Sequence, residues 1–358
     1  MSKHRAASGA GFTAGSDAWA WFDGLLATEL VEVTDDPRRL DSGGWWALCI
    51  TYEGWATFAR FADVRQASLP RGSWVGPARD SWSTPMSRDD YMSAVVRIQE
   101  HIAAGDIYQG NVCRVLNAEL PDPESSDIAG LATVLAEGNP APFAGAINLP
   151  EHQVQVVTAS PELFLQREGS LLRSQPIKGT GRTEADLQDK DIAENIMIVD
   201  LVRNDISQVC QTGSVDVPEL VAVQHHPGLV HLVSTIEGLL EPQTSWGNIF
   251  DATFPPGSVT GCPKPRAVEL LAEVEQHPRG PYCGAVGYID ADAQRAVLAV
   301  GIRTFWLDGG RLWFGAGAGI TAGSDPAAEW DETELKAANL LSVAAGVCES
   351  SPAASHVI

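Results

Sequence analysis

Basic residues are scarce in this sequence, which has 24 Lys and Arg against 46 Asp and Glu and a formal net charge of -22 over 358 residues. Such a charge repels polyanions and excludes extended binding of nucleic acid or of an acidic lipid surface. Long apolar runs are also lacking. No stretch approaches the roughly 20 residues of a membrane span, and the basic start MSKHRAASGAGFTAGS is not followed by the apolar run of a secretory signal. We therefore expect a soluble, cytoplasmic protein that contacts no membrane.

Cysteine is infrequent and never forms a CxxC pair, which argues against a structural zinc site. Because the thiols are scattered, we expect reduced cysteines and no disulfides, as in a cytosolic protein. The six cysteines are Cys49, Cys113, Cys210, Cys262, Cys283 and Cys348.

The composition is that of a globular protein, with 44% hydrophobic and 20% charged residues. Residues 1 to 67 hold five tryptophans, so this part is expected to pack against a core rather than form a tail. Residues 68–90 are rich in Pro, Gly, Ser and Arg, as in a connecting segment. We place a boundary near residue 85, which gives an N-terminal segment (1–84), a main domain (85–350) and a short C-terminal tail (351–358).

Helical and strand-like patterns occur in separate runs. A start signal at Ser87 with Asp90, apolar residues at helical spacing and Gly105 predict a helix between residues 87 and 105. Further helices are predicted at 186–209, 246–253, 265–275 and 325–345, with strands within 111–176, 213–240 and 285–320. Strands that arrive in runs favour an α+β fold over a doubly wound parallel sheet.

The stretch QPIKGTGR, residues 175–182, places Lys178 beside residues that let a chain approach a ligand closely. Pro176 fixes one backbone angle, and Gly179 and Gly181 remove two side chains. We interpret the stretch as a ligand-binding loop that carries a lysine. The alternative is an ordinary solvated charge.

The sequence Gly317-Ala318-Gly319 with Ala322 fits the GxGxxA pattern of dinucleotide-binding proteins. That fingerprint requires a further strand with an acidic residue about 20 residues later, and here the sequence runs into VAAGVCESSPAASHVI instead. We expect only a glycine-rich turn before a helix, whose backbone N–H groups can bind a small carboxylate.

Two predicted helices each carry carboxylates on one face. Glu329, Glu332 and Lys336 are spaced by three and seven residues, and Asp191 and Glu194 by three. A solvated charged face is the alternative for each. Together the carboxylates can hold one hard divalent cation, and because no His or Cys shares the spacing, we expect Mg²⁺ rather than zinc.

Three more residues stand out because they are polar within apolar runs. Glu162 in SPELF ends an apolar strand, where burial raises a carboxyl pKa and suits it to be a general acid. Arg303 in VGIRTF calls for a carboxylate partner. His231 in GLVHLVS is either a pocket residue or a satisfied core histidine. Together, these candidate residues suit a substrate that is a small dicarboxylate with a leaving group.

These motifs occur together in the chorismate-utilising enzymes, which the sequence resembles from about Asp89 to Leu341. The similar segments are GDIYQGNVCR, ASPELFL, PIKGTGR, AENIMIVDLVRNDI, VHLVSTIEG, PPGSVTGCPKPRA, GAVGYID, GIRTF, GAGAGITAGS and AEWDETELKAANLL. The resemblance implies a large antiparallel β-sandwich with outer helices.

The resemblance also implies a role for each candidate residue. Glu194 and Glu332 are similar to the Mg²⁺ ligands, with Asp191 and Glu329 close by or acting through water, and Glu162 to the acid that protonates the departing C4 hydroxyl of chorismate. Lys178, Glu162 and His231 are the expected catalytic residues. The expected substrate-binding residues are Arg303, Tyr282, Ser258, Thr180, Lys336 and the backbone of Gly317, Ala318 and Gly319.

Two positions indicate the reaction within this family. Members that add ammonia or water at C2 typically have a small residue at the position of Lys178, and salicylate and isochorismate synthases have a lysine base at the position of Gln109. The combination found here resembles aminodeoxychorismate synthase component I, where the lysine is expected either to attack C2 or to block it as a cation. The alternative is anthranilate synthase component I. A catalytically idle regulatory subunit would have lost these residues, and none is lost.

The ammonia source is expected to be a separate glutamine amidotransferase subunit, because the matched segments leave no room for a glutaminase domain. The implied product is 4-amino-4-deoxychorismate, a precursor of p-aminobenzoate and folate. Residues 1–84 are shorter than the N-terminal half usual in the family, so an allosteric tryptophan pocket is not carried over.

Overall fold

Helix α1 (Arg88–Ala104) begins and ends at its sequence signals. In the computed structural model, which describes residues 18–181, 183–187, 189–226 and 229–346, the Ser87 hydroxyl accepts from the Asp90 N–H while the Asp90 carboxylate accepts from the Ser87 N–H. Gly105 closes the helix in the left-handed region, as a C-terminal glycine does. Buried Tyr91, Ala94, Val95 and Ile98 form its inner face, so the predicted helix is confirmed.

Four other predicted helices are confirmed within a few residues, and one is new. The new helix, α2, is capped by Asp127, whose carboxylate accepts from the Gly130 N–H at 2.7 Å. The remaining helical elements are α2 (Ile128–Gly138), α3 (Asp189–Ser207), α4 (Trp246–Thr253), α5 (Lys264–Val274) and α6 (Pro326–Ala344), with short 3-10 helices η1 (Pro37–Ser42), η2 (Pro150–His152), η3 (Glu184–Asp186) and η4 (Gly257–Val259).

The strands form one sheet, and every described pairing in it is antiparallel. The strands are β1 (Trp19–Phe22), β2 (Leu25–Thr34), β3 (Trp45–Ile50), β4 (Ala56–Gln66), β5 (Gln109–Glu119), β6 (Phe143–Leu149), β7 (Val154–Ser160), β8 (Leu163–Glu168), β9 (Leu171–Gln175), β10 (Ile177–Gly181), β11 (Asp216–His226), β12 (Leu229–Leu239), β13 (Gly261–Cys262), β14 (Ala285–Asp290), β15 (Arg295–Val300), β16 (Thr304–Asp308) and β17 (Arg311–Ile320).

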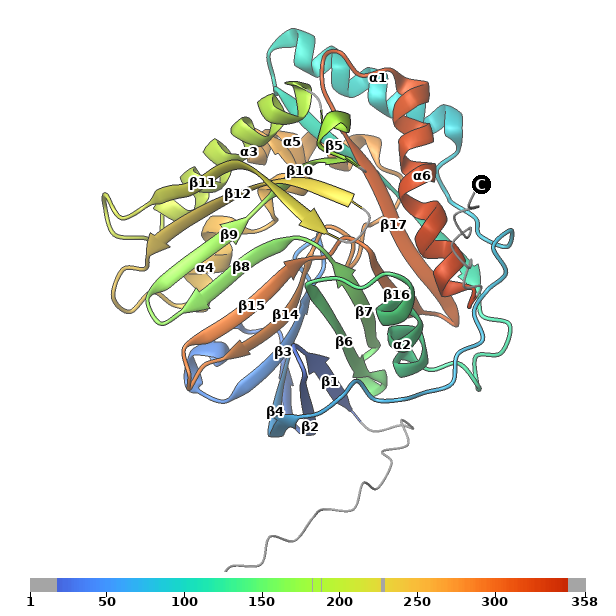
Figure 1. Ribbon diagram of the computed structural model, residues 1–358, viewed down its shortest axis with the longest axis vertical. Helices are drawn as coiled ribbons and strands as arrows, with labels where there is room; N and C mark the ends of the chain where they lie inside the picture. Colours follow the sequence, from blue (N-terminus) through green and yellow to red (C-terminus); the bar gives the residue numbers. More distant parts are fainter. Residues whose placement is uncertain (1–17, 182, 188, 227–228, 347–358) are drawn as a thin grey trace, which may run out of the picture.

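The pairings can be followed as one continuous path from β11 to β13. The order along it is β11, β12, β9, β8, β15, β14, β3, β4, β2, β1, β6, β7, β16, β17, β5 and β13. Strand β10 pairs with β12 next to β9. Helix α3 packs on β10, β11 and β12 at one end of the path, and α1, α5 and α6 pack on β5 and β17 toward the other (Figure 1). The α+β architecture of antiparallel strands with outer helices is thus confirmed.

Residues 18–66 belong to the same sheet. Trp19–Phe22 pairs with β6, and Trp45–Ile50 pairs with β14, so the N-terminal strands fill the middle of the path. Trp19 and Trp46 are fully buried. The five described cysteines are free thiols, and no described helix is long and apolar enough to cross a bilayer.

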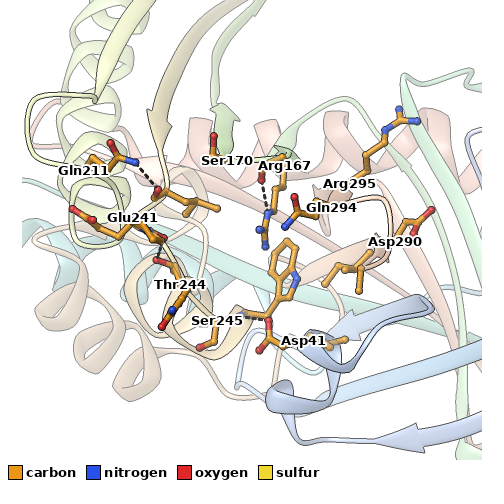
Figure 2. A pocket seen from close by; sticks show the side chains of 18 residues that line it. Asp41, Arg167, Ser170, Gln211, Glu241, Thr244, Ser245, Asp290, Gln294 and Arg295 are labelled. Carbon is orange, nitrogen blue, oxygen red and sulfur yellow. Dashed lines mark hydrogen bonds between the residues drawn. The ribbon is translucent and has the colours of Figure 1, made fainter.

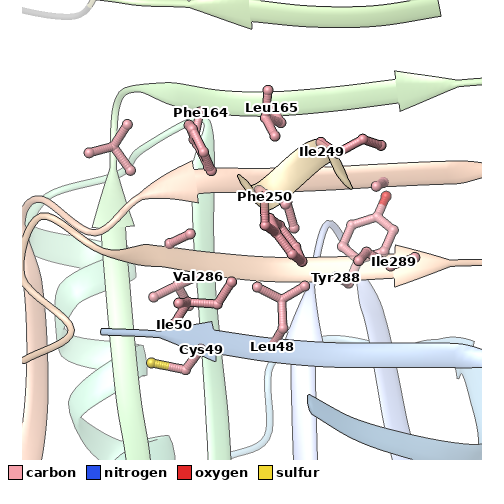
Figure 3. Close-up of a cluster of buried hydrophobic side chains, with 14 of the residues drawn as sticks. Leu48, Cys49, Ile50, Phe164, Leu165, Ile249, Phe250, Val286, Tyr288 and Ile289 are labelled. Carbon is pink, nitrogen blue, oxygen red and sulfur yellow. The ribbon is translucent and has the colours of Figure 1, made fainter. Parts of the chain in front are cut away.

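The main core lies where α4 packs on β3, β8 and β14 (Figure 3). Phe250 of α4 stacks on Phe58 at 6.2 Å between ring centroids, and Leu48 and Val286 are fully buried beneath it. Burying side chains of this size stabilises the fold by about 1.5–3 kcal/mol each. The core therefore provides a rigid base for the strands that lead to the functional residues.

Candidate active site

Lys178 lies in a strand rather than in the predicted loop. Strand β10 pairs with β12 at Ile177 and again at Thr180, with a shift of register between these two residues. Gly179 stands in this bulge with a φ of 81°, which glycine adopts without strain. A Cβ there would lie 2.9 Å from the Cβ of Asp191, so the bulge packs directly on α3. The Pro and Gly residues mark a bulge, and the loop prediction was wrong.

The Lys178 side chain is set among carboxylates. Desolvation is the largest influence on its pKa and lowers it, while Glu194 and Glu162 oppose the shift. Lys336 lowers the pKa further, and Glu332 acts in the opposite direction. The net direction is down, although the residue is partly exposed. The burial of this amine therefore favours its neutral form.

Glu162 directly precedes β8 and is 4% exposed. Its carboxylate accepts hydrogen bonds from the Ser258 hydroxyl and from the Ile177 backbone N–H. Burial raises the pKa of Glu162 to about 7, against the lowering effect of these hydrogen bonds and of Lys178. A carboxyl that titrates near neutrality is suited to give a proton to a leaving group and to take one back.

Helices α3 and α6 bring their carboxylates toward the same place. Burial is the largest cause that raises the pKa of Glu194 and of Glu329. Asp191 and Glu329 raise the pKa of Glu194 further, and Glu332 raises that of Glu329, because neighbouring like charges disfavour ionisation. Oxygen donors that repel one another in this way fit a hard divalent cation such as Mg²⁺. Within the described residues, however, no three of them converge as a complete metal-binding group.

Lys336 connects α6 to β17. Its ammonium lies 2.6 Å from the carboxylate of Glu332, four residues earlier on the same helix, and donates to the carbonyl of Gly317 at 3.0 Å. The predicted common face of Glu329, Glu332 and Lys336 therefore points toward β17.

Gly317, Ala318 and Gly319 lie within strand β17, not in a turn before a helix. They pair with Cys113, Val112 and Asn111 of β5, and α6 begins separately after its cap at Asp325. The turn prediction was wrong because a strand that is paired along ten residues outweighs the local preference of glycine for turns.

The backbone groups of Gly317 and Gly319 nonetheless point toward the site. The N–H groups of Asn111 and Cys113 bond to Thr260 and Glu275, so their pairs with these two glycines are the non-hydrogen-bonded pairs of the antiparallel ladder. The glycine N–H and C=O groups therefore point away from β5. The bond from Lys336 to the Gly317 carbonyl agrees with this.

Gly319 of β17 lies close to side chains of β5 and of helix α3. A Cβ on this residue would lie 2.6 Å from Gln109 Nε2 and 3.6 Å from Glu194 Oε2. Gln109 is 1% exposed, and its Oε1 has no hydrogen-bond partner among the described residues. Neither periodicity nor spacing identified Gln109, and only the family resemblance drew attention to it.

Arg303 lies between β15 and β16 with a φ of 52°, a backbone angle that is uncommon for residues other than glycine. Its guanidinium is half-buried, and burial lowers its pKa. In the part of the chain that the structure describes, the side chain makes no ion pair or hydrogen bond. Such a cation fits an anionic ligand.

The remaining predicted site residues are Tyr282, His231 and Thr180. Tyr282 is 5% exposed, and a Cβ on Gly315 of β17 would lie 2.0 Å from its ring. His231 is buried in β12 opposite the backbone of Thr180. The Thr180 side chain lies outside the described part. No described hydrogen bond or ion pair joins Arg303 or Tyr282 to the group around Lys178.

A cavity of about 490 Å³ lies apart from these residues (Figure 2). Its lining includes Asp41, Arg167, Trp246 and Gln294, and none of the predicted site residues. The Arg167 guanidinium lies 5.8 Å from the Trp246 ring centroid. We place the candidate active site at the Lys178 group instead, because the perturbed carboxyl and amine groups gather there.

Residues 57–342 match the protein family described as chorismate binding enzyme. This chain belongs to that family. The match begins upstream of Asp89, within β4, and ends near the end of α6, so it includes every predicted site residue.

Two curated members of the family show how close the relationship is. Aminodeoxychorismate synthase component 1 of Escherichia coli is 37% identical over 272 residues, which cover 73% of this chain and 58% of the relative. Anthranilate synthase component 1 of Thermus thermophilus is 38% identical over 275 residues, which cover 74% and 58%. The matched part thus spans 58% of the length of these relatives, and identity does not separate the two activities.

Solved structures confirm the fold. Anthranilate synthase component I of Streptococcus pneumoniae superposes with a TM-score of 0.74 at 21% identity, covering 95% of each chain. The menaquinone-specific isochorismate synthase of Escherichia coli superposes with a TM-score of 0.78 at 19% identity, covering 95% of this chain and 92% of that one.

Proposed function

We propose that this chain is component I of an aminodeoxychorismate synthase, which replaces the C4 hydroxyl of chorismate by an amine. The observation that carries the proposal is the position of Lys178 on β10, where its electrostatic neighbours are Glu162, Glu194 and Glu332. The E. coli relative with this name, 37% identical, is compatible with the choice, which rests on Lys178 and not on identity.

Each group has a defined task in this reaction. Glu194 and Glu332, with Asp191 and Glu329 near them, would hold Mg²⁺, which supplies positive charge to bind the ring carboxylate of chorismate. Arg303, whose guanidinium makes no ion pair with the described residues, would bind the enolpyruvyl carboxylate. The outward N–H groups of Gly317 and Gly319 add donors at the same place.

Glu162 gives its proton to the C4 hydroxyl so that the oxygen leaves as water. Its pKa of about 7 makes the protonated form available at neutral pH. The hydrogen bonds from Ser258 and from the Ile177 N–H hold the carboxyl in place. Because Ile177 is adjacent to Lys178, acid and amine are positioned by the same strand.

Lys178 can direct the incoming nitrogen to C4 in two ways. As a neutral amine, Lys178 attacks C2 while the C4 hydroxyl leaves. Ammonia then adds at C4 and displaces the lysine from C2. As an ammonium it occupies the space at C2 and leaves only C4 open. The lowered pKa of Lys178 supports the first route, and both routes give 4-amino-4-deoxychorismate.

Gln109 supports amination at C4 because its side chain lacks a basic group. An amide has no basic nitrogen at neutral pH, so it cannot activate water at C2 as a lysine base would. Its buried position next to Gly319 and Glu194 supports this role.

Anthranilate synthase component I is the second candidate, because the T. thermophilus relative with that name is 38% identical. The presence of Lys178 disfavours it. The names of both relatives include "component 1", and we propose that a glutamine amidotransferase subunit delivers the ammonia. The product would enter p-aminobenzoate and folate synthesis in the cytoplasm.

The direct test incubates the purified chain with chorismate, an ammonium salt and either Mg²⁺ or excess EDTA, and identifies the product by mass spectrometry and NMR. The amine is expected at C4, and EDTA is expected to abolish its formation. Lys178→Ala should lower the rate by about a hundredfold or more. The control Arg97→Ala, which removes an exposed cation of α1, should leave the rate unchanged.

An amine at C2 would replace this proposal by the anthranilate synthase reaction. A Lys178→Ala variant that makes 4-amino-4-deoxychorismate at the normal rate would remove its physical basis. Lys178→Arg separates the two routes: it keeps the cation but not a nucleophilic amine, so retained activity would favour blocking over attack.

A further inference from the structure

A buried charge pair lies close to the candidate site. Lys264, at the start of α5, donates to Asp205 of α3 at 2.6 Å and to the Thr253 carbonyl at 2.8 Å. Asp205 is 5% exposed and Lys264 is 9% exposed. The roles assigned above use neither residue.

A contribution to the stability of the fold is a weak explanation for burying such a charge pair. The desolvation of two charges offsets much of their attraction, and well-packed apolar residues often stabilise a fold equally well. The Asp205 oxygen that is not bonded to Lys264 accepts no hydrogen bond from the described residues. Burial raises the pKa of Asp205 to about 6, against the effect of Lys264, so this carboxyl exchanges protons near neutrality.

A small hollow joins Asp205 to the proposed acid. Its volume is about 10 Å³, and both Glu162 and Asp205 line it. A space of this size holds about one water molecule when polar groups surround it, and Ser174, Thr253 and Ser258 also line it. Lys178, Glu194 and Glu332 do not line it, so the hollow is separate from the group of charged residues around Lys178.

The proposed reaction leaves Glu162 in need of a proton. The C4–O bond breaks and the hydroxyl leaves as water with the proton of Glu162, while a C4–N bond forms to neutral ammonia. If the amine leaves as an ammonium ion, it keeps all three ammonia hydrogens, and Glu162 remains a carboxylate. One proton from solvent then restores the acid in each cycle, with no electron transfer.

We propose that Asp205, held by Lys264, passes this proton to Glu162 through a water in the hollow. Asp205 regains it from solvent at its exposed edge, which is 8% of the side chain. The charged groups that act on the two carboxyls are Lys178 from β10 for Glu162 and Lys264 from α5 for Asp205. The inference rests on the proposed function only in requiring that Glu162 protonates the C4 hydroxyl.

The test measures ammonia-dependent turnover of the full chain with chorismate and Mg²⁺ in H₂O and in D₂O. Asp205→Asn removes the acid but leaves the Lys264 cation buried, so the double variant Asp205→Asn/Lys264→Met is prepared as well, and thermal unfolding verifies that both fold. Asp200→Asn, on the exposed side of α3, is the matched control.

Both Asp205 variants are expected to lower kcat by about tenfold to a hundredfold, with KM for chorismate within twofold of wild type and a larger solvent isotope effect on kcat. The control should match wild type. If Asp205→Asn does not fold, the double variant carries the test. Wild-type kcat in the double variant, or a lower kcat with an unchanged isotope effect, would overturn the relay. A wild-type chain that aminates no carbon of chorismate would instead refute the proposed function.

Discussion

Replacing Glu162 by Gln should make the stability of the protein less dependent on pH. The folded state raises the pKa of this carboxyl from its ordinary value of 4.5 to about 7, chiefly by burial. Between those two pH values the unfolded chain releases the proton while the folded chain keeps it. The stability contributed by protonated Glu162 is therefore complete below the unfolded pKa and is lost as pH rises through the folded pKa.

The size of the effect follows from the shift. A pKa difference of one unit corresponds to about 1.4 kcal/mol, so Glu162 should cost the wild-type fold about 3 kcal/mol between pH 4.5 and pH 7 and little more above that. Gln keeps the shape and can accept the N–H of Ile177, but it does not ionise. The free energy of unfolding of Glu162→Gln, relative to wild type, should thus rise by about 1.4 kcal/mol per pH unit in this interval.

Urea unfolding of both proteins at half-unit steps from pH 4.5 to pH 8.5 measures the difference directly. Glu168→Gln is the control, because Glu168 is exposed at the end of β8 and should give a difference that does not vary with pH. A flat difference for Glu162→Gln, or one that falls as pH rises, would refute the burial argument and with it the assignment of Glu162 as an acid that is still partly protonated at neutral pH.

Three further variants test other parts of the structure. Arg303→Gln should raise KM for chorismate by about tenfold to a hundredfold, the value of one charge-assisted hydrogen bond, and steady-state kinetics with an unchanged KM would contradict its binding role. Arg279→Met should lower the free energy of unfolding by about 3–5 kcal/mol in urea titrations, because it leaves the buried carboxylate of Glu275 without its partner. The double variant Arg279→Met/Glu275→Leu should recover most of this loss. A single variant as stable as wild type would contradict this prediction. Gly319→Ala should raise KM for chorismate at least about tenfold because the added methyl group crowds the ligand. The control Gly323→Ala, at a position with open space around it, should leave KM unchanged. Equal KM values for the two variants would show that no ligand approaches Gly319.

The helices that carry their own start and stop signals were predictable from sequence. For α1, the reciprocal hydrogen bonds of Ser87 and Asp90 and the left-handed Gly105 are local, so a short window holds all the information. Helix α2 was missed although Asp127 caps it. Its residues Ile128 to Ala132 are all buried, and a helix that is apolar on most sides shows no clear periodicity.

The two wrong predictions have one physical cause. From local preference, Gly179 was assigned to a loop and Gly317 to a turn. Each lies instead in a strand whose partner is remote in sequence, β12 for Gly179 and β5 for Gly317. Long-range pairing decides such cases, and a single sequence carries no direct signal of it. For the same reason the contact of Glu162 with Ser258, 96 positions apart in the numbering, had no local signature.

The path of strands from β11 to β13 also explains how the width of the site is set. In the part of the chain that is described, no backbone pairing joins β10 or β12 to β5 or β17, yet Lys178 comes from the first group and Gly319 from the second. A slight increase in the curvature of the intervening ladder would bring the two groups closer without breaking one interstrand hydrogen bond. A ligand held by both would tie together strands that lie far apart along this path of pairings, so capture of the ligand and stiffening of the whole sheet become one event.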